Sequence, residues 1–194
     1  FVRLRLTAKG AAVDELDARF ETLLQELKGL PYEEQHGQTT EEEIARRLRQ
    51  AHTTVACAES CTGGNIAHLI TSVPGASAYF LGGVVSYSNE VKKNVLGVRS
   101  GDLEKYGAVS EAVAVQMAQG ARRVTGAQWA VSTTGIAGPD GGTPEKPVGT
   151  VWIGVAGPNG AKAQKFVFSH TRERNIGRAS VKALQLLLAE MERG

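Results

Sequence analysis

The segment Ala58-Glu59-Ser60-Cys61-Thr62-Gly63-Gly64 brings a carboxylate, a hydroxyl, a thiol and two glycines together within a few residues. An apolar run at 53–58 precedes it and a helical pattern at 66–70 follows it, so the segment is predicted to be a strand-to-helix turn. The backbone amides of residues 62–65 would then be the unpaired start of a helix. Such a turn binds an anion, or holds a nucleophile beside an oxyanion site.

Ser60 is the first candidate nucleophile of this turn, and Cys61 is its rival because a thiol is intrinsically more reactive. The pattern differs from G-x-S-x-G, and a hydroxyl at this position has the alternative role of capping the next helix. A serine nucleophile needs a base, and a lysine can serve when burial lowers its pKa. Lys92 and Lys93 follow Tyr87 by about one helical turn, although a solvated surface lysine is the simpler interpretation of either.

Two further polar segments are predicted to follow strands. The glycine-rich loop 133–142 lets a ligand approach the backbone closely, and its consecutive amides can form a nest for a phosphate or a carboxylate. It lacks the G-x-x-x-x-G-K-[ST] pattern of an ATP-binding loop. Arg172, Arg174 and Arg178 straddle the start of the last predicted helix, where they do not favour the helix dipole. Anion recognition and ion pairs, either with Glu173 or with another subunit, are equal alternatives for these arginines.

The composition is that of an ordinary globular protein. The chain has 194 residues, of which 42% are hydrophobic and 22% are charged, enough for one well-buried domain and a small additional piece. A net charge of +2 is weak ground for nucleic-acid binding, and no apolar run approaches the roughly 20 residues of a membrane-spanning helix. Cys57, Cys61 and four scattered histidines form no zinc pattern. We therefore expect a cytoplasmic protein with two reduced thiols and no metal.

The apolar periodicity predicts an α/β fold, a three-layer α/β/α sandwich on a mixed sheet. The expected elements are a strand at Val2–Leu6, a helix at Ala11–Leu27, a linker at 28–38, a helix opened by a Thr40/Glu43 capping box, a strand at 53–58, a helix at 65–72, a strand at 81–87, a helix at 90–96 capped by Ser88 or Asn89, a loop at 102–106, a helix at 111–124 capped by Ser110, a strand at 128–132, a hairpin of 150–155 with 163–168, and a helix at about 174–192.

Four motifs carry a family resemblance. They are AESCTGG at 58–64, YSNEVKKNVLGV at 87–98, STTGIAGPDGGTPEKPVGTVWIGVA at 132–156 and TRERNIGRAS at 171–180. Together, and in this order, they resemble the CinA C-terminal domain family over about residues 40–194. That family includes nicotinamide mononucleotide deamidases (PncC), which release nicotinate mononucleotide and ammonia in pyridine nucleotide salvage.

The resemblance also has implications for the domain organisation. Residues 1–36 resemble the end of the KH-like middle domain of full-length CinA, so we expect a remnant of that domain plus a linker at 1–36 and the CinA C-terminal domain at 37–194. A missing N-terminal domain of the molybdopterin-binding-like type, associated with ADP-ribose pyrophosphatase activity, is a further implication. The family also suggests a homodimer or a larger homo-oligomer.

The roles that the resemblance implies can be placed residue by residue. Ser60 would be the nucleophile, Lys92 its general base and Tyr87 a polar member of the site, with no metal or cofactor. Helix-start amides near Thr62 to Gly64 would bind the tetrahedral oxygen. The substrate, nicotinamide mononucleotide, would be bound or its site shaped by Glu59, Thr62, Gly63, Gly64, Thr134, Gly135, Ala137, Gly138 and Arg174. The alternative from another functional class is a non-catalytic module that senses a nucleotide or binds a partner linked to competence or DNA damage.

Overall fold

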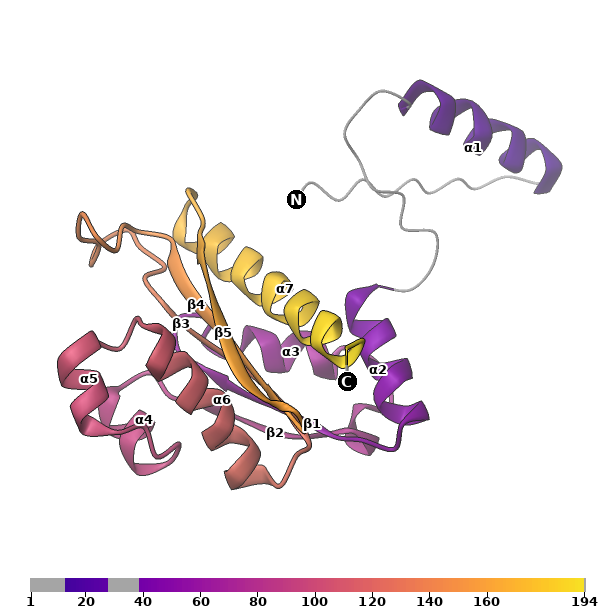
Figure 1. Ribbon diagram of the computed structural model, residues 1–194. Helices are drawn as coiled ribbons and strands as arrows, with labels where there is room; N and C mark the ends of the chain where they lie inside the picture. Colours follow the sequence, from indigo (N-terminus) through magenta and orange to yellow (C-terminus); the bar gives the residue numbers. More distant parts are fainter. Residues whose placement is uncertain (1–12, 28–38, 194) are drawn as a thin grey trace. The chain divides into compact units, whose positions relative to one another are not determined.

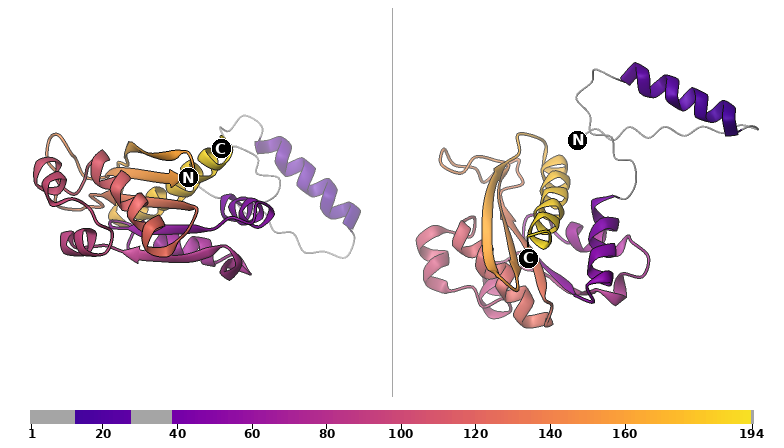
Figure 2. Two further views of the ribbon diagram at one scale, coloured as in Figure 1. Left: turned by 60° about the horizontal axis from the view of Figure 1, so that its bottom comes forward. Right: turned by 45° about the vertical axis from the view of Figure 1, so that its right-hand side comes forward.

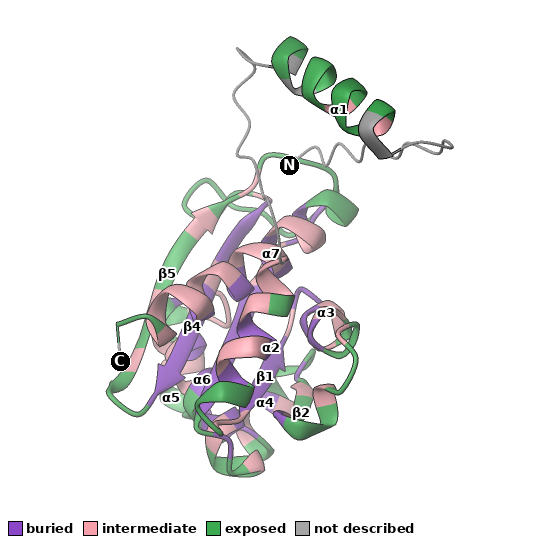
Figure 3. Ribbon diagram, turned by 90° about the vertical axis from the view of Figure 1, so that its right-hand side faces the viewer, coloured by how far each residue is buried: buried purple, intermediate pink, exposed green. Residues whose placement is uncertain are grey.

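The computed structural model describes residues 13–27 and 39–193, and the chain divides into two compact units, 1–37 and 38–194. In the first unit the predicted helix is present as α1 (Val13–Leu27), most of whose described side chains are exposed (Figure 3). The strand expected at Val2–Leu6 and the linker expected at 28–38 lie outside the described residues.

The second unit is the predicted three-layer α/β/α sandwich (Figures 1 and 2). Its strand order is β2-β1-β3-β4-β5, in which β1 runs parallel to β2 and β3 while β4 and β5 continue antiparallel. The elements are α2 (Thr40–Gln50), β1 (Val55–Glu59), α3 (Asn65–Thr71), a 3-10 turn η1 (Ala76–Ala78), β2 (Phe80–Val85), α4 (Asn89–Asn94), α5 (Ser100–Tyr106), α6 (Glu111–Thr125), β3 (Trp129–Gly135), β4 (Thr150–Gly157), β5 (Gly160–Val167) and α7 (Arg172–Met191).

Side chains alternate across β1 and build a separate core on each face of the sheet. Val55 and Cys57 pack in the cluster formed with α2, α3 and α7, whereas Ala56 and Ala58 pack against α6. Because all of β1 is buried, its sequence is a continuous apolar run rather than an alternating one. The central strands are accordingly the most buried part of the ribbon (Figure 3).

Two local predictions were wrong. The capping box that opens α2 is formed by Thr39 and Glu42, one residue earlier than expected, because the run TTEEE offers the same spacing twice. Glu43 instead contacts Arg46 and Arg47 on the next turn. The segment expected to be a loop at 102–106 lies in α5, which is too short for an apolar period to be visible.

The turn between β1 and α3 also differs from its prediction, because its helix-start amides are largely occupied. The carboxylate of Glu59 is buried beneath α3 and accepts the amides of Gly64, Ile66 and Ala67 at 3.0, 3.0 and 2.9 Å. It also accepts the hydroxyl of Thr62 at 2.6 Å. A negative charge at a helix start satisfies donors that have no partner within the helix. Glu59 therefore fixes where α3 begins and how the preceding turn is oriented.

This arrangement predicts a large difference between the two carboxylates that cap helices. Glu59→Gln should lower the free energy of unfolding by about 2–3 kcal/mol, because it removes a buried charge that accepts several hydrogen bonds. Glu42→Gln, at the exposed cap of α2, should cost only about 0.5–1 kcal/mol. Urea denaturation of both variants measures the difference. Equal losses would mean that Glu59 is no more than an ordinary helix cap.

Candidate active site

A cavity of about 300 Å³ opens at the carboxyl ends of the three parallel strands. The connections leaving β1 and β2 cover opposite faces of the sheet, because α3 packs with one core and α6 with the other. Ligand sites of open α/β sheets form where such connections diverge. The cavity is lined by Ser60, Cys61, Tyr87, Asn89, Lys92, Ala108, Val109, Thr134, Gly135, Ile136, Ala137, Gly138, Asp140 and Arg172.

Ser60 and Lys92 meet in this cavity. Lys92 Nζ donates to Ser60 Oγ at 3.0 Å and to the backbone carbonyl of Ser86 at 2.7 Å. Ser60 follows β1 directly, and its amide still donates to Thr133 O as a last rung of the sheet. Lys92 comes from α4, whose first turn is capped by the side chain of Ser88. The sheet and the capped helix thus hold the hydroxyl and the amine within hydrogen-bond distance.

Lys92 is almost completely buried, with 1% of its surface exposed. None of the described acidic side chains forms an ion pair with it; its Nζ contacts only the hydroxyl and the carbonyl. Burial without a counter-ion disfavours the ammonium form and lowers the pKa of Lys92 below its ordinary value. Lys93, by contrast, is bound to Glu90 on the outer face of α4. The ambiguity between the two lysines is resolved by burial, and the buried one can act as a proton acceptor.

Cys61 lines the same cavity but is poorly suited to be a nucleophile. Its side chain is buried, and desolvation raises the pKa of the thiol to about 12. Because the thiolate is the reactive form, a thiol with this pKa is almost entirely protonated at neutral pH. Cys57 lies deeper in the strand, where burial and the neighbouring Glu59 also raise the pKa of its thiol.

Four of the expected binding residues lie in the turn without lining the cavity: Glu59, Thr62, Gly63 and Gly64. Glu59 and Thr62 face each other in the interior, and Thr133 donates to the Thr62 hydroxyl at 2.7 Å. The Gly63 amide donates to Ser60 O, and the Gly64 amide to Glu59. Among the described residues, the amides of Cys61 and Thr62 form no hydrogen bond with another residue, and of these two residues Cys61 lines the cavity. The turn therefore positions Ser60, and the Cys61 amide is the donor it has left at the cavity.

The glycine-rich loop supplies one wall of the cavity through Thr134, Gly135, Ala137 and Gly138, whose role in binding a substrate stays a prediction. Thr134 Oγ1 donates to Ala108 O at 2.8 Å, which joins the end of β3 to the start of α6. A side chain at Gly135 would lie 2.6 Å from Thr150 O, so glycine is required where the loop leaves the sheet. The base of the loop is further held by Asn175, whose side-chain amide donates to Ala137 O at 3.1 Å.

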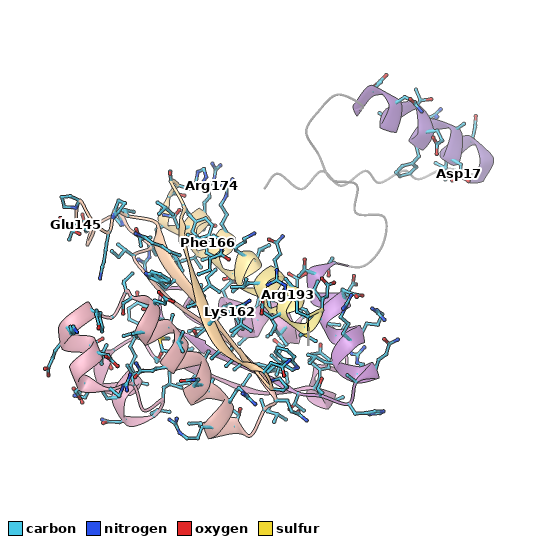
Figure 4. The ribbon with its side chains drawn as sticks, in the orientation of Figure 1. Asp17, Glu145, Lys162, Phe166, Arg174 and Arg193 are labelled. Atoms are coloured by element: carbon cyan, nitrogen blue, oxygen red, sulfur yellow. The ribbon has the colours of Figure 1, made fainter. Side chains whose placement is uncertain are left out.

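Arg172, rather than Arg174, lines the cavity. Its guanidinium donates to Gly138 O at 2.8 Å and to the Tyr87 hydroxyl at 3.0 Å, linking α7, the glycine-rich loop and the segment after β2. Arg174 lies on the exposed side of the first turn of α7, where its side chain extends away from the sheet (Figure 4). Tyr87 lines the cavity and remains well exposed.

Sequence reasoning missed Asn175, Asp140, Asn89 and the carbonyl of Ser86 as parts of the site or its support. Asp140 belongs to the glycine-rich motif and Asn175 to TRERNIGRAS, so both lie in motifs that the sequence analysis identified. The motifs did not indicate which of their side chains take part in the site. A carbonyl contact such as that of Ser86 has no signature in the residue type. In the described ranges, no group of three or more His, Cys, Asp or Glu side chains is arranged to hold a metal, and no helix is long and apolar enough to cross a membrane.

Comparison with known proteins gives one consistent family. The family model described as the CinA C-terminal domain matches residues 37–191. A CinA-like protein of Gloeothece citriformis is 48% identical over 161 residues, covering 81% of this chain and 39% of that protein. One from Desulforapulum autotrophicum is 51% identical over 156 residues, covering 80% and 37%. The chain thus spans less than half the length of these curated relatives.

Solved structures agree with the sequence relatives. A CinA superfamily protein of Klebsiella pneumoniae superposes with a TM-score of 0.76 at 34% identity, covering 81% of this chain and all of the other. A competence/damage-inducible protein of Agrobacterium tumefaciens gives a TM-score of 0.72 at 39% identity, covering 78% and 96%. With its matched region, its fold and its motif order all in agreement, the chain belongs to the CinA C-terminal domain family.

Proposed function

We propose that this chain is an amidohydrolase that converts nicotinamide mononucleotide to nicotinate mononucleotide and ammonia, a reaction of pyridine nucleotide salvage. The observation that carries the proposal is the contact between Ser60 Oγ and the buried, unpaired amine of Lys92. A hydroxyl beside a neutral amine is the arrangement that a serine-lysine hydrolase needs. Family membership supports the proposal at a coarser level, since the relatives are named only as CinA-like proteins.

In the first half of the proposed reaction, the lone pair of neutral Lys92 accepts the Ser60 proton across their hydrogen bond. Ser60 Oγ attacks the amide carbon, and the carbonyl oxygen gains the negative charge of the tetrahedral intermediate. We assign the Cys61 amide as its donor, because Cys61 lines the cavity whereas Thr62 does not, and because the Gly63 and Gly64 amides are occupied. When the intermediate collapses, the carbon–nitrogen bond breaks and the Lys92 ammonium gives its proton to the departing ammonia.

Water completes the second half. Neutral Lys92 takes a proton from the water that attacks the acyl-enzyme ester, and the ester bond to Ser60 Oγ breaks. Lys92 then returns the proton to Ser60 Oγ, so that the enzyme is regenerated and one water is consumed per ammonia released. The Ser86 carbonyl keeps Lys92 Nζ in place through both halves, because it accepts a hydrogen bond from an N–H that takes no part in the proton transfer.

Arg172 is proposed as the partner of the substrate phosphate. It lines the cavity, and its planar guanidinium keeps N–H groups beyond the two used on Gly138 O and the Tyr87 hydroxyl. Arg174, which the family resemblance indicated, lies outside the cavity lining, and its binding role stays a prediction. The homo-oligomer implied by the family also stays a prediction.

The alternative function is a module that binds a nucleotide or a competence-related partner without turnover. Its support is the family's association with competence and DNA damage in the names of solved relatives. Incubating the purified chain with nicotinamide mononucleotide and measuring ammonia distinguishes the two. Tight binding without ammonia would favour the binding module, and a steep salt dependence of association with DNA would be required for a direct nucleic-acid role.

Substitution of the two candidate nucleophiles tests the serine assignment. We expect Ser60→Ala to abolish ammonia release from nicotinamide mononucleotide, because Ser60 is the one hydroxyl among the described residues that is hydrogen-bonded to Lys92 Nζ. Cys61→Ala should keep most of the activity, because its thiol is protonated in the buried cavity wall. The opposite result, with Cys61 essential and Ser60 dispensable, would transfer the nucleophile to the thiol.

The pH dependence tests the base. Only neutral Lys92 accepts the Ser60 proton, and burial lowers its pKa, so the rate should increase as pH rises through this lowered pKa and fall as acid protonates the amine. Lys92→Arg, which is permanently charged, should reduce kcat by about 10²–10⁴-fold. Steady-state kinetics across pH, with circular dichroism to verify folding, provides the measurement. Full activity of a folded Lys92→Arg protein would refute the assignment.

Arg172 and Arg174, both in the first turn of α7, form a matched pair for testing phosphate recognition. Arg172→Gln should raise the KM for nicotinamide mononucleotide about tenfold, whereas Arg174→Gln should change it less than about twofold. Nicotinamide riboside, which lacks the phosphate, should be affected less than the mononucleotide by Arg172→Gln. If both substrates lost activity equally, Arg172 would act only by holding Gly138 and Tyr87.

A further inference from the structure

The acidic and basic side chains that line the cavity are Lys92, Asp140 and Arg172. Lys92 is buried against Ser60 and is neutral in the proposed reaction, so Asp140 and Arg172 supply the charges. Neither of them forms an ion pair with the other or with another side chain in the described ranges; Arg172 instead contacts a carbonyl and a hydroxyl. One cavity therefore presents a carboxylate and a guanidinium that do not neutralise each other.

The backbone keeps these two charges apart even though they are near neighbours along the cavity wall. Arg172 contacts the carbonyl of Gly138, which is only two residues from Asp140. Gly138 and Gly141 both adopt left-handed conformations, with φ of 88° and 89°, so the chain turns sharply on either side of Asp140. A side chain at Gly138 would also lie 2.5 Å from Val148, so both the backbone conformation and the packing require glycine there. Arg172 thus anchors the loop beside Asp140 through a backbone carbonyl and not through the carboxylate.

Glu145 provides an internal comparison, because it is an acid of the same loop that does not line the cavity. It lies at the outer end of the loop (Figure 4), where hydrogen bonds with its own backbone amide and with Thr143 lower its pKa. The loop therefore carries one acid, Glu145, that is held by local hydrogen bonds. Its other acid, Asp140, lines the cavity and has no hydrogen-bond or ion-pair partner among the described residues.

We propose that Asp140 is a specificity-determining residue that selects a cationic ring, so that the cavity accepts zwitterionic pyridinium carboxamides with a ring cation near Asp140 and an anionic group near Arg172. This inference rests on the proposed function and names the chemical class of its substrate. N-ribosylation makes the pyridine ring of nicotinamide mononucleotide positively charged, and the phosphate supplies the opposite charge. Neutral carboxamides would gain nothing from Asp140.

The placement of charge also agrees with the chemistry at Ser60. A cationic ring in the cavity would be repelled by a protonated Lys92 amine. Lys92 has to be neutral to accept the Ser60 proton, so the proposed reaction avoids this repulsion. The cavity would thus place its neutral base, Lys92, next to the reacting amide. Its two charged side chains, Asp140 and Arg172, would lie nearer to the solvent. Because Asp140 is exposed, its attraction to a cation is screened, and an effect of about fivefold on binding is appropriate.

The test compares two ligands that differ in ring charge. The Ser60→Ala protein, which cannot consume ligand by the proposed route, is titrated calorimetrically with nicotinamide mononucleotide and with its reduced form, whose dihydropyridine ring is neutral. Adding Asp140→Asn should raise the Kd for the cationic ligand about fivefold and leave that for the neutral ligand within about twofold. Adding Glu145→Gln, which removes the same charge from the same loop, should change neither Kd beyond about twofold.

The outcomes separate this inference from the function on which it rests. Equal weakening of both ligands by Asp140→Asn, no weakening of either, or an equal effect of Glu145→Gln would overturn the role of Asp140. Failure of the Ser60→Ala protein to bind nicotinamide mononucleotide would overturn it as well. If the wild-type chain released no ammonia but the charge-dependent binding were found, the inference would stand and the amidohydrolase function would fail.

Discussion

The proposed chemistry depends on an amine that the fold buries without giving it a counter-ion. Lys92 Nζ is enclosed between the Ser60 hydroxyl and the Ser86 carbonyl, and these neutral acceptors cannot offset the desolvation of an ammonium group. A carboxylate at either position would favour the charged form and raise the pKa. The absence of one from the described surroundings of Lys92 leaves an amine that is neutral, and therefore free to accept a proton, at a lower pH than a surface lysine.

The turn before α3 divides its polar residues between support and chemistry. Glu59 faces inward, where its carboxylate takes up the helix-start amides, while Ser60 faces the cavity. The same helix start cannot both be satisfied by Glu59 and offer its full set of amides to a ligand. Among the described residues of the turn, the amide of Cys61, which lines the cavity and precedes the Glu59 contacts, stays available. A stable turn and the proposed oxyanion site can therefore coexist because they use different donors.

Periodicity predicted the layers and most of the element order because burial of whole strands and helix faces leaves a repeated pattern. Short elements were harder to predict, because a helix as short as α5 shows no clear apolar period. The repeated threonines and glutamates before α2 made the predicted cap one residue too late. At the site, Ser60 and Lys92 could be named from their motifs, but spacing alone did not separate Lys92 from Lys93. Their different surroundings arise from packing of α4 on the end of the sheet, which involves residues distant in sequence.

The difference between Arg172 and Arg174 has the same origin, and it explains why the last helix matters to a site formed mostly by earlier segments. On an α-helix, residues two positions apart do not share a face. Arg172 can therefore line the cavity while Arg174 extends into solvent. Arg172 lines the cavity and ties Gly138 to Tyr87, and Asn175, one turn later, ties Ala137 to the same helix. Both side chains hold backbone or hydroxyl groups of the cavity wall from α7. A glycine-rich loop, which could otherwise sample many conformations, is thereby fixed over the Ser60–Lys92 pair, and the charges at its edge acquire defined positions relative to the reacting atoms.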